Sequence, residues 1–175
     1  RTPSSAASDV YKRQASELIA ILKNPICHSD DVNRGKHLRL VTKLETFLRK
    51  NTIIDPTVDH LHRFSKENNQ EFSQKWVKWL SIFLGKFQNE GQQELGYWLC
   101  EHISNAEYLA VGCDPLEEKT SGSLWQNDAG EMAKKIVDNI FAVASSAPSI
   151  SSSDYNKMLN TCLLYTSDAA DEGVR

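Results

Sequence analysis

The sequence predicts an all-α fold, because apolar residues recur with helical spacing along most of the chain. No stretch alternates polar and apolar residues as a half-buried strand does, and no Asn-Gly or Asp-Gly hairpin turn occurs. Helix stop and start signals stand at Asn24-Pro25, Asp55-Pro56 and Asp114-Pro115. We therefore expect a helical bundle or stacked antiparallel helical hairpins, with about six helices and no sheet.

The two ends of the chain mirror each other at the level of DNA. A coding sequence for residues 1–14 exists whose reverse complement, read one base out of register, encodes residues 162–175. Residues 4–14 also resemble the translation of a transposon adapter used in sequencing libraries. Segments of this origin are set aside before the fold is considered. We therefore expect residues 1–14 and 162–175 to be non-native, adapter-like and disordered, and the stretch between them to be a fragment of a longer protein.

The remaining stretch is long enough for about one domain. We expect a helical domain over residues 15–144, followed by a Ser/Ala/Pro linker over 145–153, where small and polar residues dominate. Residues 154–161 then begin a helix that the end of the fragment truncates.

The first expected helix covers residues 15–23 and stops at Asn24-Pro25. The second runs from the capping residues Ser29-Asp30-Asp31 to about Lys50. One half of its circumference is apolar and carries Leu38, Leu40, Val41, Leu44, Phe47 and Leu48.

A third helix starts at Asp55-Pro56, a capping carboxylate followed by proline in the first turn. Its short apolar stripe consists of Val58, Leu61 and Phe64. The strongest helical pattern follows over residues 72–87, where one broad face carries Phe72, Trp76, Trp79, Leu80, Phe83, Leu84 and Phe87. An aromatic-lined ligand pocket is one interpretation of this face. Core packing is the favoured one, since no polar group is specified to orient a ligand, and we expect this helix to form the centre of the core.

Residues 89–91 form a tight connection to a helix that ends at Gly112. Its apolar face carries Leu95, Trp98, Leu99, His102, Ala106 and Leu109. The long stretch 111–127 is irregular, and Asp128 caps a last helix with Met132, Ala133, Ile136, Val137, Ile140 and Ala144 at helical spacing.

One weak internal repeat is present. The apolar pattern that starts at Leu40 returns at Trp79, an offset of 39 residues, close to the period of stacked helical-hairpin repeats of about 40–47 residues. Two amphipathic helices also align in this way without any repeat, and this second interpretation is favoured.

Composition excludes some classes of protein. The chain has 20 basic and 23 acidic side chains, a net charge of −3, with a mildly basic stretch at 29–90 and an acidic one at 91–161. Cys162 belongs to the terminal segment set aside above, and the other three cysteines, Cys27, Cys100 and Cys113, are scattered and form no disulfide framework, so we expect a reducing, intracellular location in the cytoplasm. No apolar run approaches the roughly eighteen residues of a membrane span, and we expect no membrane association.

Paired metal-ligand residues occur at Cys27-His28, at His60 and His62, and at Cys100 and His102. Zinc sites use longer spacings, and residues two apart on a helix point about 200° away from each other. We therefore expect no metal and no cofactor.

No catalytic constellation is recognisable either. His102 lies on an apolar face, where a general base is one interpretation and a hydrogen-bonded core or interface histidine is the favoured one. Nothing in the sequence supplies a triad around it. Cys113 stands beside Asp114, whose negative charge lowers the reactivity of a thiol. The turn 120–123 lacks the glycine pattern of a phosphate loop. The chain therefore leans away from being an enzyme.

A basic stripe, Lys36, Arg39, Lys43 and Lys50, faces away from the apolar half of its helix. Such a stripe binds nucleic acid in some proteins, but here the aromatics lie on other faces and the chain is acidic overall. We expect a protein-interaction or scaffolding domain with an unidentified protein partner, contacting it through the stripe or the loop 111–127. A nucleic-acid-associated domain and a helical lobe of a larger enzyme are the alternatives.

Overall fold

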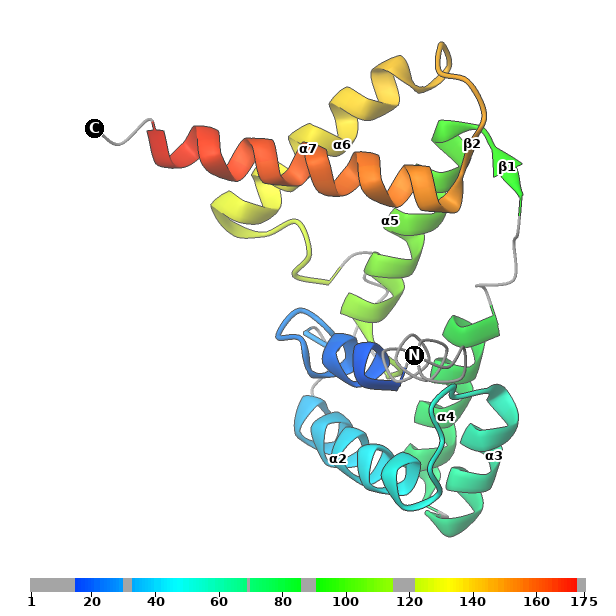
Figure 1. Ribbon diagram of the computed structural model, residues 1–175. Helices are drawn as coiled ribbons and strands as arrows, with labels where there is room; N and C mark the ends of the chain where they lie inside the picture. Colours follow the sequence, from blue (N-terminus) through cyan, green and yellow to red (C-terminus); the bar gives the residue numbers. More distant parts are fainter. Residues whose placement is uncertain (1–14, 30–32, 69, 86–90, 115–121, 173–175) are drawn as a thin grey trace, which may run out of the picture. The chain divides into compact units, whose positions relative to one another are not determined.

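The computed structural model describes residues 15–29, 33–68, 70–85, 91–114 and 122–172, with side chains described as far as residue 162. The fold is all-α, as the helical spacing predicts (Figure 1). Residues 15–23 are helical. The elements that follow are α2 (Arg34–Lys50), α3 (Val58–Glu67), α4 (Glu71–Gly85), β1 (Gln92–Gln93), α5 (Leu95–Val111), α6 (Asn127–Ala144), β2 (Ile150–Ser151) and α7 (Ser152–Glu172).

The described residues belong to two compact units, where the sequence predicts a single domain over 15–144. Unit 1 comprises the chain up to residue 87 together with residues 108–122, and unit 2 comprises residues 88–107 and 123 onward. The division falls inside α5, between Glu107 and Tyr108, where the helix continues without a break. A boundary inside a continuous helix leaves no Gly- or Pro-rich signal, so composition does not reveal it.

Unit 1 is built around α4, as its aromatic pattern predicts. Trp76 and Leu80 are completely buried, and Phe83 is nearly so. The other side of the core comes from residues 15–23, α2 and α3, through Leu18, Ile19, Leu22, Leu40, Val41, Leu44, Phe47, Leu48, Leu61 and Phe64. Each buried large side chain contributes on the order of 2–3 kcal/mol through removal of apolar surface from water. Leu38, expected on the apolar half of α2, is instead exposed.

Unit 2 has a smaller core between α5, α6 and α7, formed by Leu95, Leu99, Ala144, Tyr155 and Leu159. Trp98 lies over Tyr155, with ring centroids 6.3 Å apart, and its indole N–H donates to the carbonyl of Ile150 at 2.9 Å. This hydrogen bond connects α5 to the residues just before α7. The apolar face predicted for α6 is only partly covered, because Met132 remains exposed.

The expectation of no sheet is wrong in one detail. β1 and β2 form an antiparallel pair in unit 2, with Gln92 opposite Ser151 and Gln93 opposite Ile150 (Figure 1). Each strand has two residues, too few to show an alternating pattern in the sequence.

The C-terminal part also departs from the expected linker and tail. The sequence predicts a linker over 145–153, but its last residues form β2 and the first turn of α7. Ser151 caps this turn, because its hydroxyl accepts the backbone N–H of Asp154 at 3.1 Å. The backbone of α7 continues to Glu172, past the expected truncation at 161 and into the segment 162–175 for which the sequence predicts disorder. Residues 1–14, with the same prediction, lie outside the described residues.

Helix starts are displaced from the predicted signals by a few residues. The third helix begins at Val58, with Thr57 at the N-cap in place of Asp55, and His60 completes the capping box. Asp128 lies in the first turn of α6, where Gln126 occupies the N-cap. Asn33 occupies the N-cap of α2, while Asp30 and Asp31 lie outside the described residues. Within the described part of the chain, no helix combines the length and apolarity needed to cross a bilayer.

Candidate functional site

The basic stripe predicted from the sequence occupies one edge of α2. The side chains of Lys36, Arg39, Lys43 and Lys50 are all exposed. At about 100° per residue they fall within an arc of about 60°, because their spacing is three, four and seven residues. The buried residues of α2 lie on a different side of the helix. The stripe is therefore a continuous cationic edge about 21 Å long, given about 1.5 Å of rise per residue.

Few protein groups neutralise this edge. The Lys36 ammonium lies 5.4 Å from the centre of the Phe72 ring, in a cation–π contact. Among the described residues, none forms a hydrogen bond or ion pair with the side chain of Arg39, Lys43 or Lys50. These three cations depend on solvent for their hydration, so an anionic partner can approach them without displacing a carboxylate.

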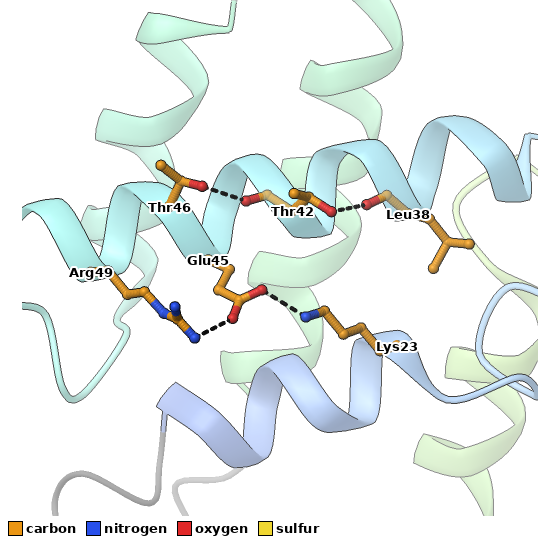
Figure 2. A network of polar contacts seen from close by, with 6 residues as sticks. All are labelled: Lys23, Leu38, Thr42, Glu45, Thr46 and Arg49. Carbon is orange, nitrogen blue, oxygen red and sulfur yellow. Dashed lines mark hydrogen bonds and ion pairs between the residues drawn. The ribbon is translucent and has the colours of Figure 1, made fainter.

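The opposite flank of α2 is different, because its charges are paired (Figure 2). Glu45 accepts hydrogen bonds from Lys23 and from Arg49, each at 2.7 Å. The Lys23 hydrogen bond is the largest cause of the lowered pKa of Glu45. Thr42 and Thr46, which lie between the two flanks, donate their hydroxyls to carbonyls one turn back, at 3.0 and 2.9 Å. The cations on this flank therefore have a carboxylate partner, whereas Arg39, Lys43 and Lys50 on the stripe have none among the described residues.

A shallow groove of about 370 Å³ lies beside the stripe, and we call it the α2/α3 groove. Lys43 and Lys50 line it on one side, and Glu67 of α3 lines it as well. The remaining lining residues are Thr42, Thr46, Phe47, Phe64 and Asn68. The groove combines two free ammonium groups with hydroxyl, amide and aromatic surface, a mixture that suits a polypeptide segment.

A buried polar cluster holds α2 against α4. The indole N–H of Trp76 donates to Nδ1 of His37 at 2.9 Å, and Nε2 of His37 lies 2.7 Å from the carbonyl oxygen of Leu22. An indole only donates and a carbonyl only accepts, so His37 carries its proton on Nε2 and is neutral. Both ring nitrogens are satisfied although the side chain is completely buried. The ring is therefore a fixed structural link between residues 15–23, α2 and α4.

His28 stacks on this histidine, with ring centroids 4.0 Å apart. Its other face meets the edge of Trp79 at 4.5 Å. Burial is the largest cause that lowers the pKa of His28, to about 3, and the charge of Arg34 acts in the same direction. His28 is thus an uncharged part of the core at neutral pH and has no role as an acid or base on an accessible surface.

The C-terminal end of α5, which belongs to unit 1, makes reciprocal contacts with α4. Tyr108 stacks on Trp79 with ring centroids 5.9 Å apart, and its hydroxyl donates to the Trp79 carbonyl at 3.1 Å. Backbone N–H groups of His28 and Ser29 donate to the carbonyls of Leu109 and Ala110. The start of the predicted contact loop 111–127 is therefore held in place by the helix end before it. Residues 115–121 of this loop, including the turn residues 120 and 121, lie outside the described part of the chain.

The cysteine and histidine pairs of the sequence do not converge. His60 is held by the capping box of α3, while His62 points elsewhere on the same helix. Cys27 is buried in unit 1, and burial raises the pKa of its thiol to about 12. Cys100 is exposed in unit 2. Within the described residues, no three potential metal ligands lie close enough together to hold an ion.

His102 is not the buried histidine that the sequence favours. It is exposed, with its ring edge-on to Tyr155 at 5.9 Å between centroids, and it lines neither the α2/α3 groove nor the other grooves described here. The buried histidines are His28 and His37 instead. The burial of His37 could be predicted from the sequence, since His37 shares the helical spacing of Val41, Leu44 and Leu48. The burial of His28 could not be predicted in this way, because His28 lies in a turn, with a φ of 58°.

Comparison of the chain with protein-family models, with curated proteins and with solved structures finds no match among any of them. The interpretation of the site therefore depends on its chemistry alone.

Proposed function

We propose that the chain is a helical interaction module that binds an acidic segment of a protein partner along the basic edge of α2. The single observation that carries this proposal is the state of Arg39, Lys43 and Lys50. They are exposed, aligned on one edge, and without an ionic partner among the described residues. Rows of like charge that are left uncompensated on a folded surface attract a complementary partner and steer its approach.

The α2/α3 groove supports a polypeptide partner. A peptide can place carboxylates on Lys43 and Lys50 while apolar side chains cover the groove between Phe47 and Phe64. Backbone amides of such a segment also find acceptors and donors in Thr46 and Asn68, which line the same groove. The contacts available are therefore both ionic and apolar, as protein interfaces require.

Nucleic acid fits the same surface less well. Glu67 lines the groove and repels any anion, but a peptide can place an apolar side chain beside it, whereas every unit of a phosphate backbone is charged. No aromatic ring of the lining is open for base stacking, because Phe47 and Phe64 are buried, and the Phe72 ring is covered by Lys36. A nucleic-acid partner would depend on phosphate contacts alone.

Fluorescence anisotropy with the full chain tests the proposal. The probes are a labelled peptide of alternating Glu and Leu, its Lys-Leu counterpart, and labelled single-stranded and duplex DNA. We expect saturable binding of the Glu-Leu peptide that weakens as salt rises, with no binding of the Lys-Leu peptide. The double variant Lys43→Glu, Lys50→Glu should weaken binding by at least about tenfold, since two attractions become repulsions.

The matched control makes the same change of charge elsewhere. Lys134 and Lys135 of α6 are exposed in unit 2 and lie outside the stripe. The variant Lys134→Glu, Lys135→Glu should bind the Glu-Leu peptide as the parent chain does. Equal losses in both double variants would show that binding follows net charge only, and DNA binding tighter than peptide binding would replace this proposal with the nucleic-acid function.

A further inference from the structure

A second groove lies between α3 and α4 in unit 1, on the other side of α3 from the α2/α3 groove. Its volume is about 480 Å³. The lining comes from His62 and Ser65 of α3 and from Gln74, Val77, Lys78, Ser81 and Ile82 of α4. These residues recur at three- and four-residue intervals, so each helix presents one edge to the groove.

Apart from the amide of Gln74, the polar lining of this α3/α4 groove consists of groups that can donate hydrogen bonds. Lys78 supplies an ammonium, His62 an imidazole, and Ser65 a hydroxyl. Among the described residues, no side-chain hydrogen bond or ion pair involves any of these three. The hydroxyl oxygen of Ser81 is buried without a hydrogen-bond partner from the described chain. This oxygen is closed off from solvent, so the donors that a ligand can reach are those of Lys78, His62 and Ser65.

Carboxylates are missing from the lining. Asp59 lies one turn before His62, and Glu71 lies one turn before Gln74, but neither lines the groove. The groove therefore presents positive charge and donors, with no acidic group from the lining residues to compete for them. This chemistry selects an anion with several acceptor oxygens.

We propose that the α3/α4 groove binds the phosphoryl group of a phosphorylated serine or threonine side chain in a protein segment. Three phosphoryl oxygens match the number of donors from Lys78, Ser65 and His62, and a charge near −2 suits a lysine with no carboxylate partner. The groove is larger than a single anion requires, and exposed Ile82 beside buried Val77 gives an apolar wall for a neighbouring side chain of the segment. A peptide-borne group uses both surfaces, while a free anion uses only the donors.

Amide chemical shifts of the full chain test this assignment. The protein is titrated separately with N-acetyl-phosphoserine-N-methylamide, with the corresponding serine compound, and with inorganic phosphate. We expect saturable shifts centred on Ser65, Lys78 and Ser81 with the phosphoserine compound. Its affinity should exceed that of the serine compound by at least about tenfold, because charge-assisted hydrogen bonds are lost with the phosphate.

Two lysines provide the matched variants. Lys78→Ala should weaken phosphoserine binding by about tenfold, whereas Lys66→Ala, on α3 but outside the lining, should leave it unchanged. Shifts that are absent from the groove, or an unchanged affinity of Lys78→Ala, would overturn the proposal. Equal affinity for inorganic phosphate would overturn it as well, by showing a site for a free anion. The lining shares no residue with the α2/α3 groove, so failure here is distinguishable from failure of the proposed function.

Discussion

Trp76 and His37 are hydrogen bonded across the core of unit 1, 39 residues apart in sequence, with 2.9 Å between the indole nitrogen and Nδ1. The contact determines more than the position of two side chains. Because His37 also reaches the Leu22 carbonyl, it fixes the rotation of α2 about its own axis. That rotation decides which edge of α2 faces solvent, and hence where the basic stripe lies.

The hydrogen bond predicts a cost for Trp76→Phe beyond the lost volume. Phenylalanine fills most of the space but leaves Nδ1 of His37 buried without a donor, which costs about 1–3 kcal/mol. Amide hydrogen exchange of α2 and α4 should accelerate accordingly. Trp98→Phe makes the same change in unit 2, where the indole donates to Ile150, and should accelerate exchange in α5 and α7 instead. Equal effects of both variants on α2 would contradict the assignment.

Acid should weaken unit 1 through His28. Burial, followed by the charge of Arg34, lowers the pKa of His28 to about 3, while an unfolded chain protonates it near about 6.5. Between these values the unfolded state binds more protons, so stability is complete above about pH 6.5 and falls as the pH decreases. The free energy of unfolding should change by about 1.4 kcal/mol per pH unit at most, which corresponds to one additional proton bound by the unfolded state.

Urea unfolding, followed through the amide signals of Leu44 and Trp76, measures this slope at a series of pH values. The control is His28→Asn, since asparagine tolerates the φ of 58° at this position and does not titrate. This variant should unfold at lower urea but show a smaller dependence on pH. A slope that persists unchanged in His28→Asn would assign the proton to another group.

Two glycines of unit 2 should respond in opposite directions to alanine. A Cβ on Gly130 would lie 2.5 Å from the Trp125 carbonyl carbon, which is backbone and does not yield easily. Gly130→Ala should therefore cost more than about 1 kcal/mol, despite the helix propensity of alanine. A Cβ on Gly96 would meet the Ala144 Cβ at an ordinary 3.7 Å, so Gly96→Ala should stabilise unit 2 by roughly 0.5–1 kcal/mol. Thermal unfolding of the two variants measures the difference, and a stabilised Gly130→Ala would contradict the packing of α6.

The helices of the chain were predictable because each buries one face, and burial leaves a periodic record in the sequence. The stripe of α2 and the aromatic face of α4 are confirmed on this basis. Periodicity gives the face of a helix but not its neighbour, so the pairing of Trp76 with His37 was not predictable. The same limit applies to His28, whose burial depends on His37 of the next helix and on Trp79 from a distant part of the chain.

The α3/α4 groove could not be predicted from the sequence for a related reason. Its polar residues lie between apolar ones on two helices, and nothing in the order of residues states that these two edges face each other. His102 shows the reverse error. It shares one face of α5 with Leu95 and Leu99, which are buried in the core of unit 2, yet it is itself exposed, so helical spacing alone does not decide how far along a helix the core extends.

The most direct test of the interaction module is to locate the bound acidic segment on the protein. In amide correlation spectra of the full chain titrated with the Glu-Leu peptide, the largest shifts should fall on Arg39, Lys43 and Lys50, and they should diminish as salt is added. The variant Lys43→Glu, Lys50→Glu should lose these shifts while its other signals keep their positions. If the largest shifts fall in unit 2, or remain in that variant, the basic edge of α2 is not the binding surface.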